Sequence, residues 1–208
     1  MKVLFLILFT MLISILFIDS FLFFNSIKKI IEKEGYFYWF NDVDKKVRNG
    51  LTLETFLNKC RRINVFDYIY LKKCGIPPQN IIIFHKSHEG GNPHTHGRFI
   101  FLPSDYKTRF TPERLKTIIN HENIHIFQRY FPCDASKAAE IMFNCHIVGF
   151  QKFGPIKYRS NPDINKILYS NITNEYMDNA SKLGDLKDKN DHPYEMMAYR
   201  YESKNLSV

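Results

Sequence analysis

Hydrophobic residues dominate the first 24 positions of the chain, and a mixture of apolar and polar residues follows them. Residues 3–18 carry no charge, and the Phe-rich stretch 21–24 comes directly after Asp19 and Ser20. A helix needs roughly 20 apolar residues to cross a bilayer, and the Phe-rich stretch extends the segment to that length. The pattern predicts an N-terminal transmembrane helix, or uncleaved signal, within residues 1–26.

Two other interpretations of the N-terminal segment remain open. A cleaved signal peptide would make the protein secreted, but it needs a small-residue cleavage site, and residues 23–27 offer only a poor one. A buried hydrophobic helix is the other alternative. Lys2 precedes the segment and Lys28, Lys29 and Lys33 follow it, so the positive-inside rule slightly favours a cytosolic domain after a single-pass anchor.

The rest of the chain, residues 27–208, has the length and apolar content of one domain. Apolar residues recur at helical spacing over 51–73, and Gly75 with Pro77 ends that helix. Two β-branched or aromatic runs, 81–84 and 98–102, predict strands that form a hairpin or a sheet edge.

A capped helix is predicted over residues 112–130. Thr111 is a suitable N-cap, Pro112 suits the first helical position, and Glu113 suits the positive end of the helix dipole. We expect a further helix over 135–150, a loop over 157–171, and short helices over 174–182 and 193–201. Together these elements predict an α+β fold that is mostly helical, with a small sheet beside the capped helix.

The net charge and the cysteines exclude only a few classes of function. The net charge of +8 comes from Lys and Arg residues spread along the chain, without the cluster typical of a nucleic-acid-binding face, so no nucleic-acid partner is expected. Cys60, Cys74, Cys133 and Cys145 show no C-x-x-C spacing. Their even number fits two disulfides if the domain is exported, with three connectivities open, of which Cys60–Cys74 with Cys133–Cys145 is the local one. In a cytosolic domain they would be buried thiols.

The strongest chemical signal is the sequence H-E-x-x-H, formed by His121, Glu122 and His125 inside the capped helix. Residues four apart lie on one face of a helix, so both imidazoles can bind one metal ion while Glu122 lies beside them. Neutral imidazole is a preferred zinc ligand, and a nearby carboxylate can take a proton from an attacking water. The alternative is a surface helix that carries these residues by chance.

The segment from Asn120 to Arg129 resembles the zincin metallopeptidases through this motif. Gln128 and Phe131 stand where the metzincin branch has Gly and His, so the chain resembles the gluzincins instead. The resemblance implies a zincin-like fold, one Zn2+ ion, hydrolysis of peptide bonds in a peptide or protein substrate, and Glu122 as general base. It also implies that an extended substrate aligns along a sheet edge, for which we expect residues 97–102.

The resemblance further implies that a glutamate from a later helix completes the zinc site with His121 and His125. Glu195 is the first candidate, because His192 to Ala198 resembles the P-x-E-x-x-A helix start of gluzincin-like families. Glu175, in a sequence similar to N-E-x-x-x-D, is the second candidate, and Glu140 is the third.

Several residues near these candidates have expected supporting roles. Tyr199, one turn after Glu195, is the candidate donor to the oxyanion that forms during attack, with His192 as a further donor. Arg129 is expected to neutralise a nearby carboxylate or to be solvated. His94 and His96 follow Gly90, Gly91 and Pro93, which favours a flexible turn over a second metal site.

The sequence therefore predicts a membrane-tethered zinc metallopeptidase. Two alternatives remain: a catalytically inactive, membrane-anchored zincin-fold protein that serves as an interaction module, and a zinc hydrolase that acts on a non-peptide amide.

Overall fold

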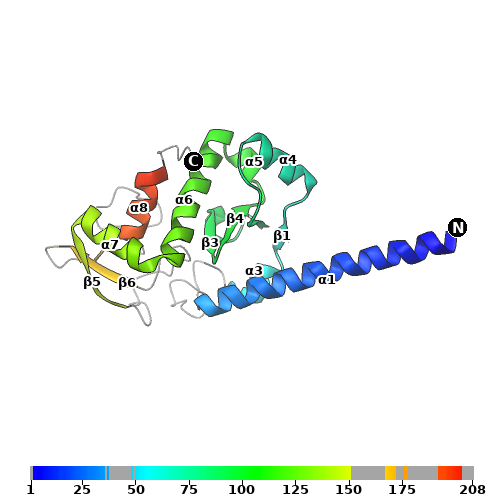
Figure 1. The fold of residues 1–208 in the computed structure, drawn as a ribbon, viewed down its shortest axis with the longest axis horizontal. Helices are drawn as coiled ribbons and strands as arrows, with labels where there is room; N and C mark the ends of the chain where they lie inside the picture. The colour runs from blue at the N-terminus through cyan, green and yellow to red at the C-terminus, as the bar shows by residue number, and fades with distance from the viewer. Residues whose placement is uncertain are drawn as a thin grey trace.

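The fold is that of a computed structural model of the chain, which describes residues 2–35, 37, 48, 50–150, 167–171, 176–177 and 192–202. Figure 1 shows a domain of mixed helices and strands, with the long helix α1 (Lys2–Glu34) along one side of it. The domain is α+β, as the sequence predicts, and a small sheet lies beside the helix that carries the H-E-x-x-H motif.

Helix α1 has two halves with different environments. Its C-terminal half belongs to the domain, because Ile27 and Ile31 are fully buried. Its N-terminal half extends beyond the domain (Figure 1) and exposes apolar side chains such as Phe5 and Phe21. Across the described ranges, no helix is both long enough and apolar enough to pass through a bilayer. The membrane anchor stays a prediction from the sequence.

A four-stranded sheet forms the centre of the domain, in the order β1 (Cys60–Arg62), β2 (Ile81–Phe84), β4 (Phe99–Pro103) and β3 (His94–His96). The strands β2 and β4 are both predicted from the sequence. They are parallel neighbours and do not form the expected hairpin; the antiparallel pair is β3 with β4. The edge strands are therefore β1 and β3, and the expectation that residues 97–102 form a sheet edge is wrong.

Alternate side chains of β2 and β4 enter two separate hydrophobic clusters, because successive residues of a strand point to opposite faces. Ile81, Ile83, Ile100 and Leu102 pack in a cluster with α4 (Val65–Lys73) and α6 (Pro112–Tyr130). The intervening residues of β2 and β4 pack in a second cluster with α1 and α3 (Leu53–Leu57). The sheet therefore lies between the motif helix on one face and α1 on the other.

The single helix predicted over 51–73 is wrong, because two short helices flank strand β1. Thr52 and Asn64 each accept a hydrogen bond from the backbone N–H three residues later, and each forms a capping box. A side chain that satisfies the first free N–H groups starts a new helix, so two caps divide the segment. The second helix, α4, ends at Lys73, as predicted.

Helix α6 begins and ends as the sequence predicts. The Thr111 side chain accepts a hydrogen bond from the backbone N–H of Arg114, and Pro112 occupies the first turn. The short helix α5 (Tyr106–Arg109) precedes it. A 3-10 turn, η2 (Glu89–Gly91), leads into β3, so His94 and His96 lie in a buried strand and not in the predicted flexible turn.

The predictions after α6 are partly wrong. Helix α7 (Pro132–Phe143) ends at Asn144, whose left-handed φ of 50° stops the helix. The apolar residues that follow form strand β5 (Cys145–Phe150), which pairs with β6 (Ile167–Asn171), within a segment predicted as loop. Tyr176 and Met177 form β7 where a helix was predicted. Helix α8 (Pro193–Glu202) agrees with the prediction for 193–201.

All four cysteines are free thiols, so neither predicted disulfide is formed. Cys74 and Cys145 are buried, Cys60 is partly buried, and Cys133 is exposed. Burial raises the pKa of the Cys60 thiol to about 12 and that of Cys145 to about 11. These two side chains therefore pack as apolar groups at neutral pH.

Candidate metal centre

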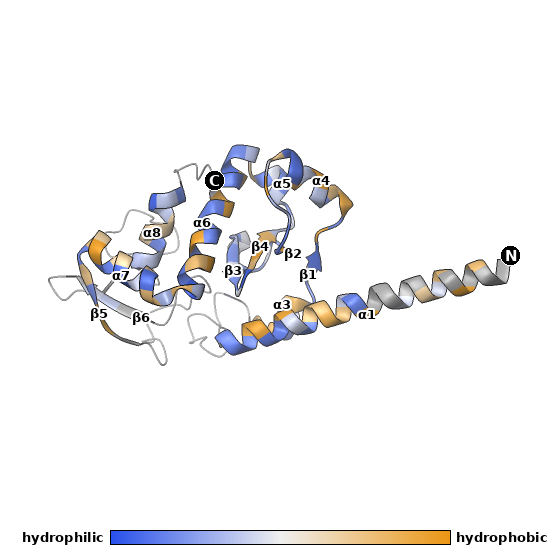
Figure 2. Cartoon of the chain, viewed as in Figure 1, coloured by the Kyte–Doolittle hydropathy of each residue, from blue (hydrophilic) through white to orange (hydrophobic). Residues whose placement is uncertain are grey.

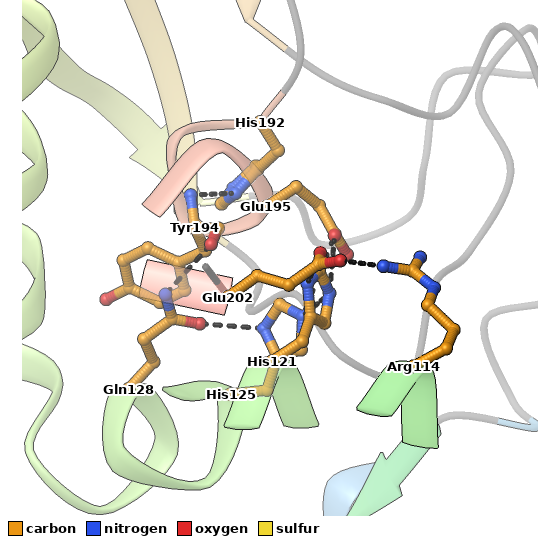
Figure 3. Close-up of polar contacts among 8 residues, drawn as sticks. All are labelled: Arg114, His121, His125, Gln128, His192, Tyr194, Glu195 and Glu202. Atoms are coloured by element: carbon orange, nitrogen blue, oxygen red, sulfur yellow. Dashed lines mark hydrogen bonds and ion pairs between the residues drawn. The ribbon is translucent and has the colours of Figure 1, made fainter. Parts of the chain in front are cut away.

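The three predicted metal ligands meet where helices α6 and α8 pack together. His121 and His125 are one turn apart on the buried face of α6, and Glu195 comes from the first turn of α8. Figure 3 shows the two imidazoles and the Glu195 carboxylate pointing toward one another. All three side chains are buried.

The distances between the donor atoms fit a zinc ion. The Nε2 atoms of His121 and His125 are 3.0 Å apart. Glu195 Oε2 is 3.4 Å from His121 Nε2 and 3.6 Å from His125 Nε2. Tetrahedral ligands about 2.1 Å from an ion are about 3.4 Å from one another. Two imidazole nitrogens and one carboxylate oxygen are also a donor set that zinc prefers, with one position left for water.

His125 is oriented by Gln128, which lies one turn later on α6. The ring Nδ1 of His125 lies 2.9 Å from Gln128 Oε1. The amide Nε2 of Gln128 donates to the carbonyl of Tyr194 on α8 at 2.9 Å. Because that donation leaves Gln128 Oε1 as an acceptor, His125 carries its proton on Nδ1. The Nε2 lone pair is then directed at His121 and Glu195, as a metal ligand requires.

His121 has a corresponding partner in Glu202, at the end of α8. Glu202 Oε2 lies 3.4 Å from His121 Nδ1, and Arg114 on α6 forms an ion pair with the same carboxylate. Figure 3 shows this Arg114–Glu202 contact beside the histidines. Carboxylates in this position fix the ring orientation of a metal-binding histidine and raise its basicity. The sequence analysis missed Glu202, because no local pattern joins it to residue 121.

The two predicted catalytic residues lie beside the three donors. Glu122 is buried at 4% exposure on the motif helix, next to His121. The ring of Tyr199 contacts the ring of His121 edge to face, with 4.6 Å between their centroids. His192, the further candidate, is buried at the start of α8, where its Nδ1 accepts a hydrogen bond from the Tyr194 N–H. That bond gives His192 a capping role.

The other candidates lie elsewhere. Glu140 Oε1 accepts a hydrogen bond from the Ile147 N–H, which links α7 to β5. Glu175 lies outside the described residues. In the ranges that the structure describes, His121, His125 and Glu195 form the one group that could hold a metal, and the histidines of β3 belong to no such group.

Arg129 does neutralise a carboxylate, but that carboxylate belongs to α1 and not to the metal centre. Its Nε lies 3.2 Å from Glu34 Oε1. Its guanidinium also donates to the carbonyl of Gly97 at 2.8 Å and to Thr95 Oγ1 at 3.1 Å. Glu34 is 2.9 Å from the buried ring of His96. These contacts join the end of the motif helix to both β3 and α1.

The carboxylates around the centre keep His121 protonated at neutral pH. Burial lowers its pKa, but hydrogen bonds to Glu195 and Glu202 outweigh that effect and raise the pKa from 6.5 to about 10. The Glu195 carboxyl shows the opposite result, because burial raises its pKa while its interactions with His125 and His121 hold it well below the usual value. Without metal, the centre is therefore a buried ion pair.

We expect zinc affinity to rise with pH, about tenfold per unit between pH 7 and 9, because zinc must displace the His121 proton. The His121 pKa is raised above its unfolded value of 6.5 to about 10. Its pairing therefore stabilises the metal-free fold fully below about pH 6.5, and the stabilisation is lost as the pH rises through 10. Chelator competition at several pH values measures the slope. An affinity that stays constant over this range would contradict the pairing.

Changing Gln128 to Leu should weaken zinc binding about 10- to 100-fold, the usual cost of losing the partner of a metal-binding histidine. The change leaves the buried Nδ1–H of His125 without its acceptor and removes the bond to the Tyr194 carbonyl. Competition with a chromogenic chelator gives the affinity. Gln128→Glu keeps the acceptor and should restore most of the binding; equal losses in both variants would show that Gln128 only packs.

Comparison of the chain with protein-family models, with curated proteins and with solved structures finds no match.

Proposed function

We propose that this protein is a zinc-dependent metallopeptidase of the gluzincin-like zincin type. The observation that carries the proposal is the convergence of His121, His125 and Glu195 on one buried centre, with donor atoms all within 4.8 Å of one another. A motif helix that supplies two histidines and a later helix that supplies a glutamate support the zincin-like fold. The sheet that packs beside the motif helix supports it as well.

Different residues of the chain have different roles in the proposed reaction. His121, His125 and Glu195 would hold one zinc ion, which lowers the pKa of a water molecule to about 7 and polarises the substrate carbonyl. Glu122 accepts the proton of that water as it attacks, and then delivers it to the leaving amine. Gln128 and Glu202 keep the two imidazoles in position. Tyr199, beside His121, donates a hydrogen bond to the oxygen that becomes negative.

Burial of the centre supports its use for hydrolysis. The Glu195 and His125 side chains are 6% and 0% exposed, so electrostatic interactions at the centre are weakly screened by water.

The test uses the purified full chain, its zinc content and its hydrolysis of a panel of unstructured proteins and peptides. We expect one zinc ion per chain, cleavage that a chelator stops, and recovery when zinc is added back. Stoichiometric zinc with no hydrolysis of any amide would favour an interaction module. Cleavage limited to non-peptide amides would favour the alternative hydrolase. A chain that binds no zinc would overturn the proposal.

A further inference from the structure

Helix α4 exposes an apolar face that nothing in the described part of the domain covers. Val65 is 63% exposed, Phe66 73% and Ile69 48%. The opposite face of the same helix is buried, with Leu71 at 0% exposure in the hydrophobic cluster beneath it. Three large exposed apolar residues on one short helix mark an interaction surface more often than a solvated one.

Lysines lie at one end of this apolar face. Lys72 and Lys73 are exposed in the last turn of α4. The acidic residue within the helix, Asp67, is buried and paired with Arg61 and with Lys107, 2.7 Å from its Oδ1. Its charge is thus neutralised inside the protein, and the outer face of α4 is apolar and positive.

The position of α4 links this face to the exposed half of α1. Arg62, two residues before the N-cap of α4, forms an ion pair with Asp19 of α1 and stacks 4.0 Å from the ring of Phe23. These contacts hold β1, the strand that precedes α4, against α1 near the point where α1 leaves the domain. Around that point Phe21 is 67% exposed and Leu22 58%. Figure 1 shows α4 at the end of the domain from which α1 projects, and Figure 2 shows hydrophobic stretches on both helices.

We propose that the outer face of α4 docks on a lipid bilayer with anionic headgroups, next to the projecting half of α1. Apolar side chains flanked by lysines suit this partner, because the apolar groups enter the acyl boundary while the cations pair with phosphate and carboxylate headgroups. A second copy of the chain fits less well, since it would bring the same net charge of +8 and the same lysines to the contact.

The test uses the full chain with the photo-reactive amino acid p-benzoylphenylalanine at position 66. The labelled protein is mixed with vesicles of phosphatidylcholine, with or without phosphatidylserine, and irradiated to form covalent adducts. The matched control carries it at position 141, where Ile141 is 74% exposed on α7, at the other end of the domain in Figure 1. We expect lipid adducts at position 66 and at least about tenfold fewer at position 141.

Each lysine near an anionic surface contributes about 1 kcal/mol, roughly a fivefold effect. Lys72→Glu with Lys73→Glu should therefore lower the adducts in phosphatidylserine vesicles about tenfold or more.

The other outcomes overturn the proposal. Adducts between two chains at position 66 would assign the face to a second copy. Equal lipid adducts at positions 66 and 141 would mean that the domain has no preferred face toward the bilayer. The proposal would also fail if position 66 formed no lipid adducts. It would fail too if the yield of adducts were the same with and without the lysine changes and with and without phosphatidylserine, because α4 would then not bind anionic lipid. None of these readouts depends on hydrolysis, so they test the surface separately from the proposed catalytic function.

Discussion

The Glu122→Gln variant is expected to hydrolyse its substrate about 10²- to 10⁴-fold more slowly than the unchanged chain, the usual contribution of a general base. Glutamine keeps the size of the buried side chain but cannot accept the proton of the attacking water. Glu122 is not among the three donors that converge on the metal centre, so zinc content should stay the same. The rate of peptide cleavage and the zinc content of the same preparation are the two measurements.

Glu113→Gln is the matched control for this change, because Glu113 lies in the first turn of the same helix and is exposed. It should leave both hydrolysis and zinc content unchanged. Full activity in Glu122→Gln would exclude Glu122 as the base. Loss of zinc in that variant would instead show that Glu122 is a ligand.

The Glu195→Gln variant is expected to lose at least about 100-fold in zinc affinity, more than the 10- to 100-fold typical of a residue that only supports a ligand. The carboxylate oxygen of Glu195 lies 3.4 Å from one imidazole nitrogen and 3.6 Å from the other. A neutral amide is a weaker ligand for zinc and leaves the two histidines without their countercharge. Competition with a chelator of known affinity measures the loss.

Two further variants test the choice of Glu195 as the third ligand. Glu140→Gln removes a carboxylate that accepts a hydrogen bond from the Ile147 N–H, and it should leave zinc affinity unchanged. Glu175→Gln tests the remaining candidate. If Glu175→Gln loses zinc and Glu195→Gln retains it, the proposed ligand set is wrong.

The sequence predicts the motif helix well because its signals are local. Thr111 and Pro112 define its start, and the spacing of His121 and His125 requires only that the helix form. Pro193 in the same way indicates the start of α8. Gln128 could also have been recognised, since it is one turn from His125 on the same face of the helix.

The pairing of strands and the contacts between distant residues could not be predicted in the same way. Glu202 and Arg114 are 88 positions apart, and nothing near either residue indicates the other. The apolar residues of β5 also suit a helix, and the left-handed conformation of Asn144 decides between the two. Short apolar runs fit both structures, so their tertiary partners determine which one forms.

The continuity of α1 limits how the domain can move. The helix runs without a break from Lys2 to Glu34, and its last turn is bound to β3 and to the motif helix through Glu34. Whatever support holds the first turns of α1 is therefore joined to the domain by one continuous helix, with no flexible segment in between. The metal centre would then work at one fixed height and tilt above that support. If the proposed hydrolysis holds, it would be restricted to polypeptide segments that reach this height.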